Sequence, residues 1–328
     1  MSPVRDADVQ PSNIAGTWYP GDAESLDCTV RELLAPASPP AGDPRAIVVP
    51  HAGYAYSGRA AGSGYAHVRP GRWRRAVVVA PSHYHAFAGG AVHPGRGFAT
   101  PLGVVAIDRA AADLLLAHTG FFADAAPYDR EHSLEIQLPF LQTVDPELPI
   151  VPVLVGADVG GAAGLAAGLR ALDDGASLFV VSSDFTHYGA AFDYLPFPPS
   201  GADEVSRKLR ELDLGAIERV CAGDASGFES YVAETGITVC GRAPISAFLH
   251  AYGAELRGET VCYYTSLDVT GDFEHSVSYA AIRFRGTEPS PGATLTRPSG
   301  TLSQDGRGES EAVTARHPRP RKQTLGRA

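Results

Sequence analysis

The 328-residue chain has little cysteine, a single methionine, two tryptophans and a deficit of positive charge. Its four cysteines form no CxxC pair, which argues against a zinc ribbon or a thioredoxin-type motif and predicts reduced thiols. Lys and Arg together number 27 against 37 for Asp and Glu, so the net charge is −10. Because nucleic-acid binding needs clustered cations, this balance argues against a surface that follows phosphates.

Long apolar runs are also missing. The first ten residues, MSPVRDADVQ, lack the apolar core of a signal peptide. No stretch of the sequence approaches the ~20 apolar residues that span a bilayer. We therefore expect a cytoplasmic protein without nucleic-acid or membrane partners. The composition, 44% hydrophobic and 20% charged, is ordinary for a globular enzyme.

The last 43 residues have a different composition from the rest. Residues 286–328 are rich in Pro, Ser, Gly and Thr and carry seven Lys and Arg against four Asp and Glu. A segment with so few large apolar side chains cannot bury enough surface to offset the entropy of ordering. We predict one domain over residues 1–285 and a disordered, basic tail over 286–328.

Short β-branched runs alternate with helical patterns in residues 1–285. This alternation predicts a single α/β domain, in which helices flank a mostly parallel central sheet. The expected strands are 46–49, 75–80, 149–155, 177–182, 261–266 and 276–284. The expected helices are 22–35, 108–118, 161–174, 202–213 and 243–253. Continuous apolar runs are typical of strands that are buried on both faces.

Three of the expected strands end in loops that carry titratable side chains. These are His51 after the first strand, His83 and His85 after the second, and Asp184 and His187 after the fourth. Because the carboxyl ends of parallel strands lie along one edge of a sheet, these side chains should converge on a crevice. Glycines near the loops, such as Gly58, permit tight turns or a close approach of the backbone.

Cys240 is a further candidate, since it precedes a helix that is expected to start near Pro244. The dipole of a helix N-terminus favours a thiolate, which suits either a nucleophile or a metal ligand. Two imidazoles and one anionic group also make up an open iron(II) site. Zinc bound by two histidines and a cysteine is chemically acceptable too, so composition leaves the metal open.

Residues 128–142 add Glu131, His132 and Glu135 ahead of an apolar run. In a helix the two glutamates, four residues apart, would share one face, and Ser133 could cap the helix. One interpretation is therefore a capped helix start with exposed acids. The other is that His132 or a glutamate orients a metal-bound histidine.

Eight motifs extend over about residues 12–285. In chain order they are AGTWYPGD, PHAGYAYSG, PSHYHAF, DREHSLEIQLPFLQ, PVLVG, VSSDFTHYG, CGRAPI and SVSYAA. Together they closely resemble the Memo family, whose bacterial and archaeal members are known as the B component of the AmmeMemoRadiSam system. The family resembles the class III extradiol dioxygenases in fold, and its animal members are described as redox-active metal binders. One departure is at His85, because many relatives place a second histidine directly after the first.

The resemblance implies roles for individual residues. His51 in HAGY and His83 in PSH match the two metal-site histidines of the family. Cys240 in CGRAPI matches its cysteine, at the position where the dioxygenases have a glutamate. His187 matches the acid–base histidine of the dioxygenases, and Asp184 matches the neighbouring site aspartate.

Three functions are compatible with these residues. The first is a non-haem iron redox enzyme, dioxygenase-like, that acts in the AmmeMemoRadiSam system with AMMECR-type and radical-SAM proteins as partners. Iron(II) is the expected metal, and copper or zinc are alternatives because a thiolate is softer than a carboxylate. The second is an iron- or copper-binding or peptide-docking protein without turnover. The third is a cysteine- or metal-dependent hydrolase with His187 as the base. The small-molecule or peptide ligand is not specified by the sequence.

Overall fold

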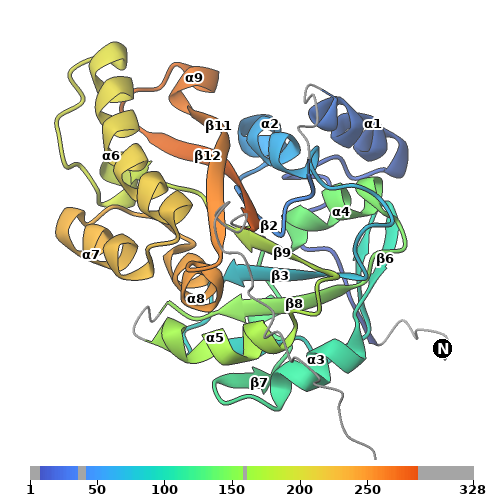
Figure 1. The fold of residues 1–328 in the computed structure, drawn as a ribbon. Helices are drawn as coiled ribbons and strands as arrows, with labels where there is room; N and C mark the ends of the chain where they lie inside the picture. The colour runs from blue at the N-terminus through green and yellow to red at the C-terminus, as the bar shows by residue number, and fades with distance from the viewer. Residues whose placement is uncertain (1–7, 36–41, 158–160, 287–328) are drawn as a thin grey trace, which may run out of the picture. The chain divides into compact units, whose positions relative to one another are not determined.

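The computed structural model describes residues 8–35, 42–157 and 161–286 of the chain. A nine-stranded central sheet has the order β10-β12-β2-β9-β3-β8-β4-β7, and β11 pairs with β12 (Figure 1). Its strands are β2 (Ala46–Val49), β3 (Arg75–Pro81), β4 (Gly90–Val92), β7 (Phe121–Ala123), β8 (Ile150–Val155), β9 (Ser177–Ser182), β10 (His187–Tyr188), β11 (Leu256–Thr265) and β12 (Ser276–Gly286). Apart from Gly286, the tail predicted at 286–328 lies outside the described residues.

The centre of the sheet is parallel. Strands β2, β9, β3 and β8 run in the same direction and are buried along almost their whole length, as their continuous apolar sequences predict. The α/β class expected from the sequence is thus confirmed. Strands β11 and β12 instead form an antiparallel hairpin, because the link between them is shorter than the crossover that a parallel pair needs.

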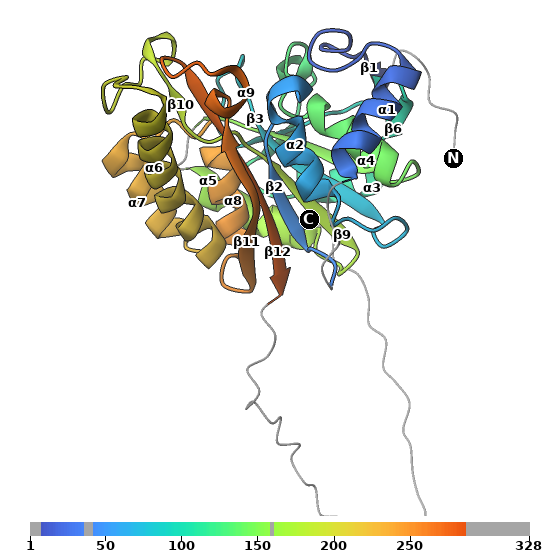
Figure 2. The same ribbon diagram turned by 90° about the horizontal axis from the view of Figure 1, so that it is seen from above.

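Helices cover both faces of the sheet. Figure 2 shows α1, α2 and α4 on one side of it and α5, α6, α7 and α8 on the other. The helices are α1 (Ala23–Leu34), α2 (Tyr54–Tyr65), α3 (Arg109–Leu116), α4 (Leu138–Val144), α5 (Ala162–Ala171), α6 (Ala202–Ala222), α7 (Ala225–Thr235), α8 (Arg242–Tyr252) and the short α9 (Leu267–Thr270). A separate small sheet contains β1 (Val9–Gln10), β5 (Gly97–Thr100) and β6 (Gly103–Ala106). Within the described ranges, no helix has the length and apolar character to cross a membrane.

Helices α2, α7 and α9 were not expected from the sequence, and α6 is longer than expected. The sequence did not predict α2, because its glycines suggest turns, yet Gly58 lies inside this helix. At Gly62 a Cβ atom would overlap the carbonyl group of Leu33, so this glycine lets α1 and α2 approach each other closely. Helix α6 continues well beyond residue 213 and ends at Ala222, where Gly223 adopts a φ of 72°.

Candidate metal centre

The loops after β2, β3 and β9 meet at one edge of the sheet. The backbone N–H of His51, which follows β2, donates to Asp184 Oδ1, which follows β9, at 2.8 Å. The rings of His51 and His83 lie 5.2 Å apart, measured between centroids. Cys240 Sγ, from the loop before α8, lies 3.0 Å from His51 Nε2. These four side chains therefore form one cluster, whereas His85 is exposed on the loop after β3.

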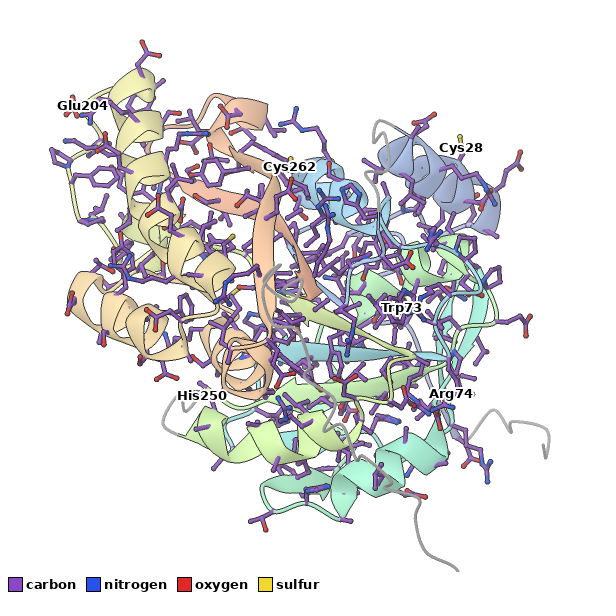
Figure 3. The ribbon with its side chains drawn as sticks, viewed as in Figure 1. Cys28, Trp73, Arg74, Glu204, His250 and Cys262 are labelled. Atoms are coloured by element: carbon purple, nitrogen blue, oxygen red, sulfur yellow. The ribbon has the colours of Figure 1, made fainter. Side chains whose placement is uncertain are left out.

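The other three cysteines lie elsewhere in the fold. Cys28 is exposed on α1, and Cys262 is partly buried on β11 (Figure 3). Cys221 is partly buried on α6, with its Sγ 3.6 Å from the hydroxyl group of Thr260. Within the described part of the chain, none of the three belongs to a group of metal-ligating side chains. Cys240 is thus the cysteine with a candidate chemical role.

Hydrogen bonds fix the protonation of the His51 ring. Ser182 has one hydroxyl proton, which it donates to the Ser133 carbonyl at 2.6 Å. Gln137 Nε2 donates to the Pro50 carbonyl at 3.0 Å and to Ser182 Oγ at 2.9 Å. Ser182 Oγ can then only accept from His51, so the His51 Nδ1 atom, 2.9 Å away, carries the proton. The lone pair of the ring is left on Nε2, which is the form that binds a metal.

Glu131 fixes the protonation of His83 in a similar way. Its Oε2 accepts the backbone N–H of His83 at 2.6 Å, and its Oε1 lies 2.8 Å from His83 Nδ1. Although burial opposes ionisation, the hydrogen bonds from His83 lower the pKa of Glu131 to about 2. A carboxylate can only accept, so His83 Nδ1 carries the proton and Nε2 is left with the lone pair. Carboxylate partners of this kind commonly orient metal-bound histidines.

His132 adds a third imidazole, for which the sequence left both a structural and a functional role open. Its ring stacks on that of His83, with 4.7 Å between centroids and 15° between planes, and lies 4.3 Å from the Trp18 ring. Burial lowers the pKa of His132 to about 4, so the ring is neutral at pH 7. Its Nδ1 atom is buried and has no hydrogen-bond partner. In the sequence, the feature that pointed to His132 was its position directly after Glu131.

Of the two interpretations of Glu131 and Glu135, the capped helix start with exposed acids is wrong. A 3₁₀ helix (Glu135–Gln137) leads into α4 at Leu138, and the two glutamates are buried, with 2% and 3% of their surface exposed. The Ser133 hydroxyl does not cap a helix but donates to the Pro81 carbonyl at 2.7 Å. Hydrogen bonds between these side chains and other segments compete with helix formation here. The alternative interpretation, in which a glutamate orients a site histidine, agrees with the contact between Glu131 and His83.

Glu135 holds an N-terminal segment of the chain against the cluster. Its carboxylate accepts hydrogen bonds from the hydroxyl groups of Ser12 and Tyr19, at 2.6 and 2.7 Å. Trp18 lies between these two residues in the sequence and contacts the His132 ring. A residue in the middle of the chain thus fixes an aromatic side chain from its beginning beside the candidate site.

Cys240 is buried next to Asp184, whose backbone N–H donates to Cys240 Sγ at 3.2 Å. Burial raises the pKa of the Cys240 thiol well above its ordinary value, and the nearby Asp184 carboxyl raises it further. The expectation that the dipole of the following helix favours the thiolate is therefore wrong for the metal-free protein, because desolvation outweighs it. A bound cation reverses this balance, since a coordinated thiol is deprotonated.

His187 follows Asp184 by three residues and begins strand β10. Its Nδ1 atom is 3.0 Å from the carbonyl oxygen of Phe185 and 3.1 Å from that of Thr238. Because carbonyl groups only accept, Nδ1 carries the proton and Nε2 has the lone pair. The backbone N–H of His187 donates to Thr238 Oγ1 at 2.8 Å, which holds the loop in place.

Asp213 anchors this loop from α6, and the sequence analysis missed it. Its Oδ1 accepts from the backbone N–H and the hydroxyl of Thr186, at 3.1 and 2.6 Å. Its Oδ2 accepts from the Tyr263 hydroxyl at 2.7 Å. Asp213 is fully buried, although an aspartate within a helical pattern suggests a solvated position. Only the tertiary structure brings its donors together.

The described residues contain two overlapping groups of metal-ligating atoms, in each of which all atoms lie within 4.8 Å of one another. One group is His51, His83 and His132, and the other is His51, Asp184 and Cys240. The ligand set predicted from the sequence, His51, His83 and Cys240, combines members of both. His187 belongs to neither group. Imidazole groups beside a thiol and a carboxyl group fit iron, copper or zinc.

A cavity of about 320 Å³ lies beside the cluster. His132, Trp18, Tyr84 and Arg130 are among the residues that line it. The Arg130 guanidinium lies over the Tyr84 ring, 5.0 Å from its centroid. A larger cavity of about 660 Å³, lined by residues of α1 and α4, has no histidine or cysteine in its wall. Of the candidate metal ligands, His132 lies in the wall of the smaller cavity.

The fold and this cluster define a class: an α/β protein with a candidate metal centre of histidine and cysteine at the carboxyl edge of its parallel strands. The family model described as Memo-like protein matches residues 10–283. The chain belongs to the Memo family.

Curated relatives agree with this assignment. Protein MEMO1 of Danio rerio is 34% identical over 285 residues, which cover 81% of this chain and 94% of the relative. Protein memo-1 homolog of Caenorhabditis elegans is 32% identical, with coverage of 81% and 80%. A MEMO1 family protein of Thermococcus kodakarensis is 32% identical, with coverage of 83% and 98%. The similarity thus extends over 80–98% of the length of these animal and archaeal relatives.

Proposed function

We propose that this Memo-family protein is a dioxygenase-like redox protein that holds one iron(II) ion through His51, His83 and Cys240. The observation that carries the proposal is the protonation of the two rings. Both Nδ1 atoms are used as hydrogen-bond donors, so the lone pair of each ring is on Nε2, and that of His51 faces the Cys240 thiol at 3.0 Å, whose proton a bound cation displaces. Copper and zinc are the alternative ions for these donors.

A bound iron(II) ion would supply the electron-transfer and dioxygen chemistry that side chains lack. The protein would supply the position of the substrate and the proton transfers. His187 is the proposed acid–base residue, because its Nε2 lone pair is free while Nδ1 is fixed by two carbonyl groups. Asp184 would position His51 through the backbone hydrogen bond between them. The cavity beside Tyr84, which His132 also lines, is the proposed entry for a small substrate.

A second candidate function is metal binding or peptide docking without turnover. Two large exposed side chains support it: Tyr84, 47% exposed, is close to His83, and Phe192, 39% exposed, lies 5.3 Å from the His187 ring. Aromatic side chains of this kind are common at binding surfaces. A metal-free cysteine hydrolase is less compatible with the site, because burial raises the pKa of the Cys240 thiol that would be the nucleophile.

The proposed cellular setting follows from the family resemblance. We place the protein in the cytoplasm, in the AmmeMemoRadiSam system, with AMMECR-type and radical-SAM proteins as partners. Binding of purified AMMECR-type protein from the same organism, measured with and without metal, tests this part of the proposal.

The metal function is tested with untagged protein purified without oxygen, its metal content being measured by mass spectrometry. We expect one iron per chain, lost in His51→Ala and His83→Ala and retained in the matched control His85→Ala. Full metal content in both site variants refutes the ligand assignment.

Turnover is tested with catechol-type compounds and dissolved oxygen. In an enzyme, His187→Gln keeps the iron and lowers oxygen consumption roughly 10²–10⁴-fold, the usual scale for a general acid–base residue. Equal, negligible oxygen consumption by both proteins supports the non-catalytic candidate instead.

A further inference from the structure

We infer that the ion has a second position in this protein, in which the three imidazoles of His51, His83 and His132 hold it and the Cys240 thiol is not a ligand. The inference rests on the proposed metal function, with which it shares two histidines. It adds His132 as a ligand and changes the donor set from nitrogen and sulfur to nitrogen alone.

The arrangement of the three rings supports this position. Their ligating atoms lie within 4.8 Å of one another. The His51 ring is edge-on to both others, at 5.2 Å and 78° from His83 and at 5.5 Å and 77° from His132. His83 and His132 are stacked, so one of them tilts when both direct a lone pair at the same ion. The cavity that His132 lines gives this ring space to tilt.

The Nδ1 atoms of His51 and His83 each have a hydrogen-bond partner, whereas that of His132 has none. That atom is buried and makes no hydrogen bond, and only 9% of the residue is exposed. It lies 3.5 Å from Glu131 Oε1, which is too long for an ordinary hydrogen bond. Buried polar groups are rarely left unsatisfied in native proteins. A metal ion bound at Nδ1 would give this buried nitrogen the partner that it lacks in the described structure.

The two positions exclude each other. His51 Nδ1 is a donor to Ser182, so Nε2 is the only lone pair that His51 offers. One lone pair binds one ion, and His51 is common to both groups of ligands. The protein therefore holds one ion at a time, either beside Cys240 or among the three imidazoles.

The donor sets differ in the ions that they prefer. Three neutral imidazoles suit borderline divalent ions such as cobalt, nickel, copper and zinc, whereas a thiolate favours softer ions. If the second position exists, removal of the thiol changes the ligands of the ion without abolishing binding.

The experiment is a double-mutant cycle with Co²⁺, whose thiolate complexes have a charge-transfer band in the near ultraviolet. Wild-type protein is expected to bind one Co²⁺ and to show this band. The Cys240→Ala variant is expected to bind one Co²⁺ as well, but to lack the charge-transfer band. His132→Phe keeps a ring in the stack and is expected to change the Kd less than about threefold in the wild-type background. In the Cys240→Ala background it should raise the Kd more than about 100-fold, beyond the 10–100-fold typical of a lost outer partner.

His132→Gln serves as a second variant in case the phenylalanine disturbs folding, which circular dichroism monitors, and His85→Ala is the matched control. If Cys240→Ala binds no Co²⁺, or if His132→Phe has the same effect in both backgrounds, the inference is overturned while the proposed function stands. If the wild-type protein itself binds no Co²⁺, both are overturned.

Discussion

The hydrogen bonds around Ser182 lead to a prediction about how a residue that is not a ligand controls the metal. Ser182→Ala removes the acceptor of the His51 Nδ1 proton, the acceptor of one Gln137 N–H and the donor to the Ser133 carbonyl. Without that acceptor, the proton of the His51 ring is no longer held on Nδ1. In the other tautomer, Nε2 presents an N–H group to the ion in place of a lone pair.

The magnitude follows from these lost contacts. A buried polar group left without a partner costs about 1–3 kcal/mol, and Gln137 keeps its second acceptor, Pro50. We therefore expect Ser182→Ala to lower the free energy of unfolding by about 2–4 kcal/mol. Loss of an outer partner of a metal-bound histidine lowers metal affinity about 10–100-fold, and we expect a decrease in this range.

The assays separate the effect on the metal from the effect on stability. Urea unfolding gives the stability of the metal-free protein, and competition with a chelator gives the Kd for Co²⁺ or Zn²⁺. Two-bond ¹⁵N–¹H correlation spectra report the tautomer of His51 directly.

Ser177 is a matched control, because it is fully buried on the same strand and its hydroxyl donates to the Leu172 carbonyl at 2.7 Å. Ser177→Ala should lose stability but keep its metal affinity, and Ser182→Thr, which keeps the hydroxyl, should restore most of the affinity. The reasoning fails if Ser182→Ala binds the metal within about twofold of wild type, or if its His51 proton stays on Nδ1.

Two further predictions concern buried ionisable groups. The pKa of His132 is lowered from 6.5 to about 4, so the unfolded chain takes up this proton at a higher pH than the folded one. The His132 ring therefore contributes about 3 kcal/mol to the free energy of unfolding above pH 6.5. This contribution is lost as the pH falls toward 4. Urea unfolding of metal-free protein across this range should show the loss, and His132→Phe, but not His85→Phe, should reduce it. Tyr263→Phe removes one donor to the buried Asp213 carboxylate and should lower the free energy of unfolding by about 1.5–3 kcal/mol. A change below 0.5 kcal/mol would mean that this hydrogen bond does not hold the loop of His187.

The parallel core could be predicted from the sequence because its signal is local. The apolar runs of β2, β3, β8 and β9 are continuous, and the strand ends carry the polar residues that meet in space. The order of the strands then brings His51, His83 and Asp184 together without further information. Cys240 was recognised partly from its own motif and partly from the family resemblance.

Other features depend on contacts between distant segments, which no local pattern encodes. Helix α2 contains glycines because α1 packs closely on it, so its sequence suggests turns. Glu131 and Glu135 have helical spacing, but their partners lie in other parts of the chain. The pKa of Cys240 likewise reflects burial by the whole fold, and a nearby helix end says nothing about burial.

The hold of Glu135 on the N-terminal segment has a consequence for handling the protein. Trp18 forms part of the cavity wall beside His132, and it is kept there by hydrogen bonds from Ser12 and Tyr19 to a carboxylate more than one hundred positions later in the chain. The segment before the first strand of the central sheet is therefore part of the site. A deletion that trims the chain to its first long helix would leave the parallel core and the histidines intact, yet would open the cavity on one side and leave Glu135 buried without its donors.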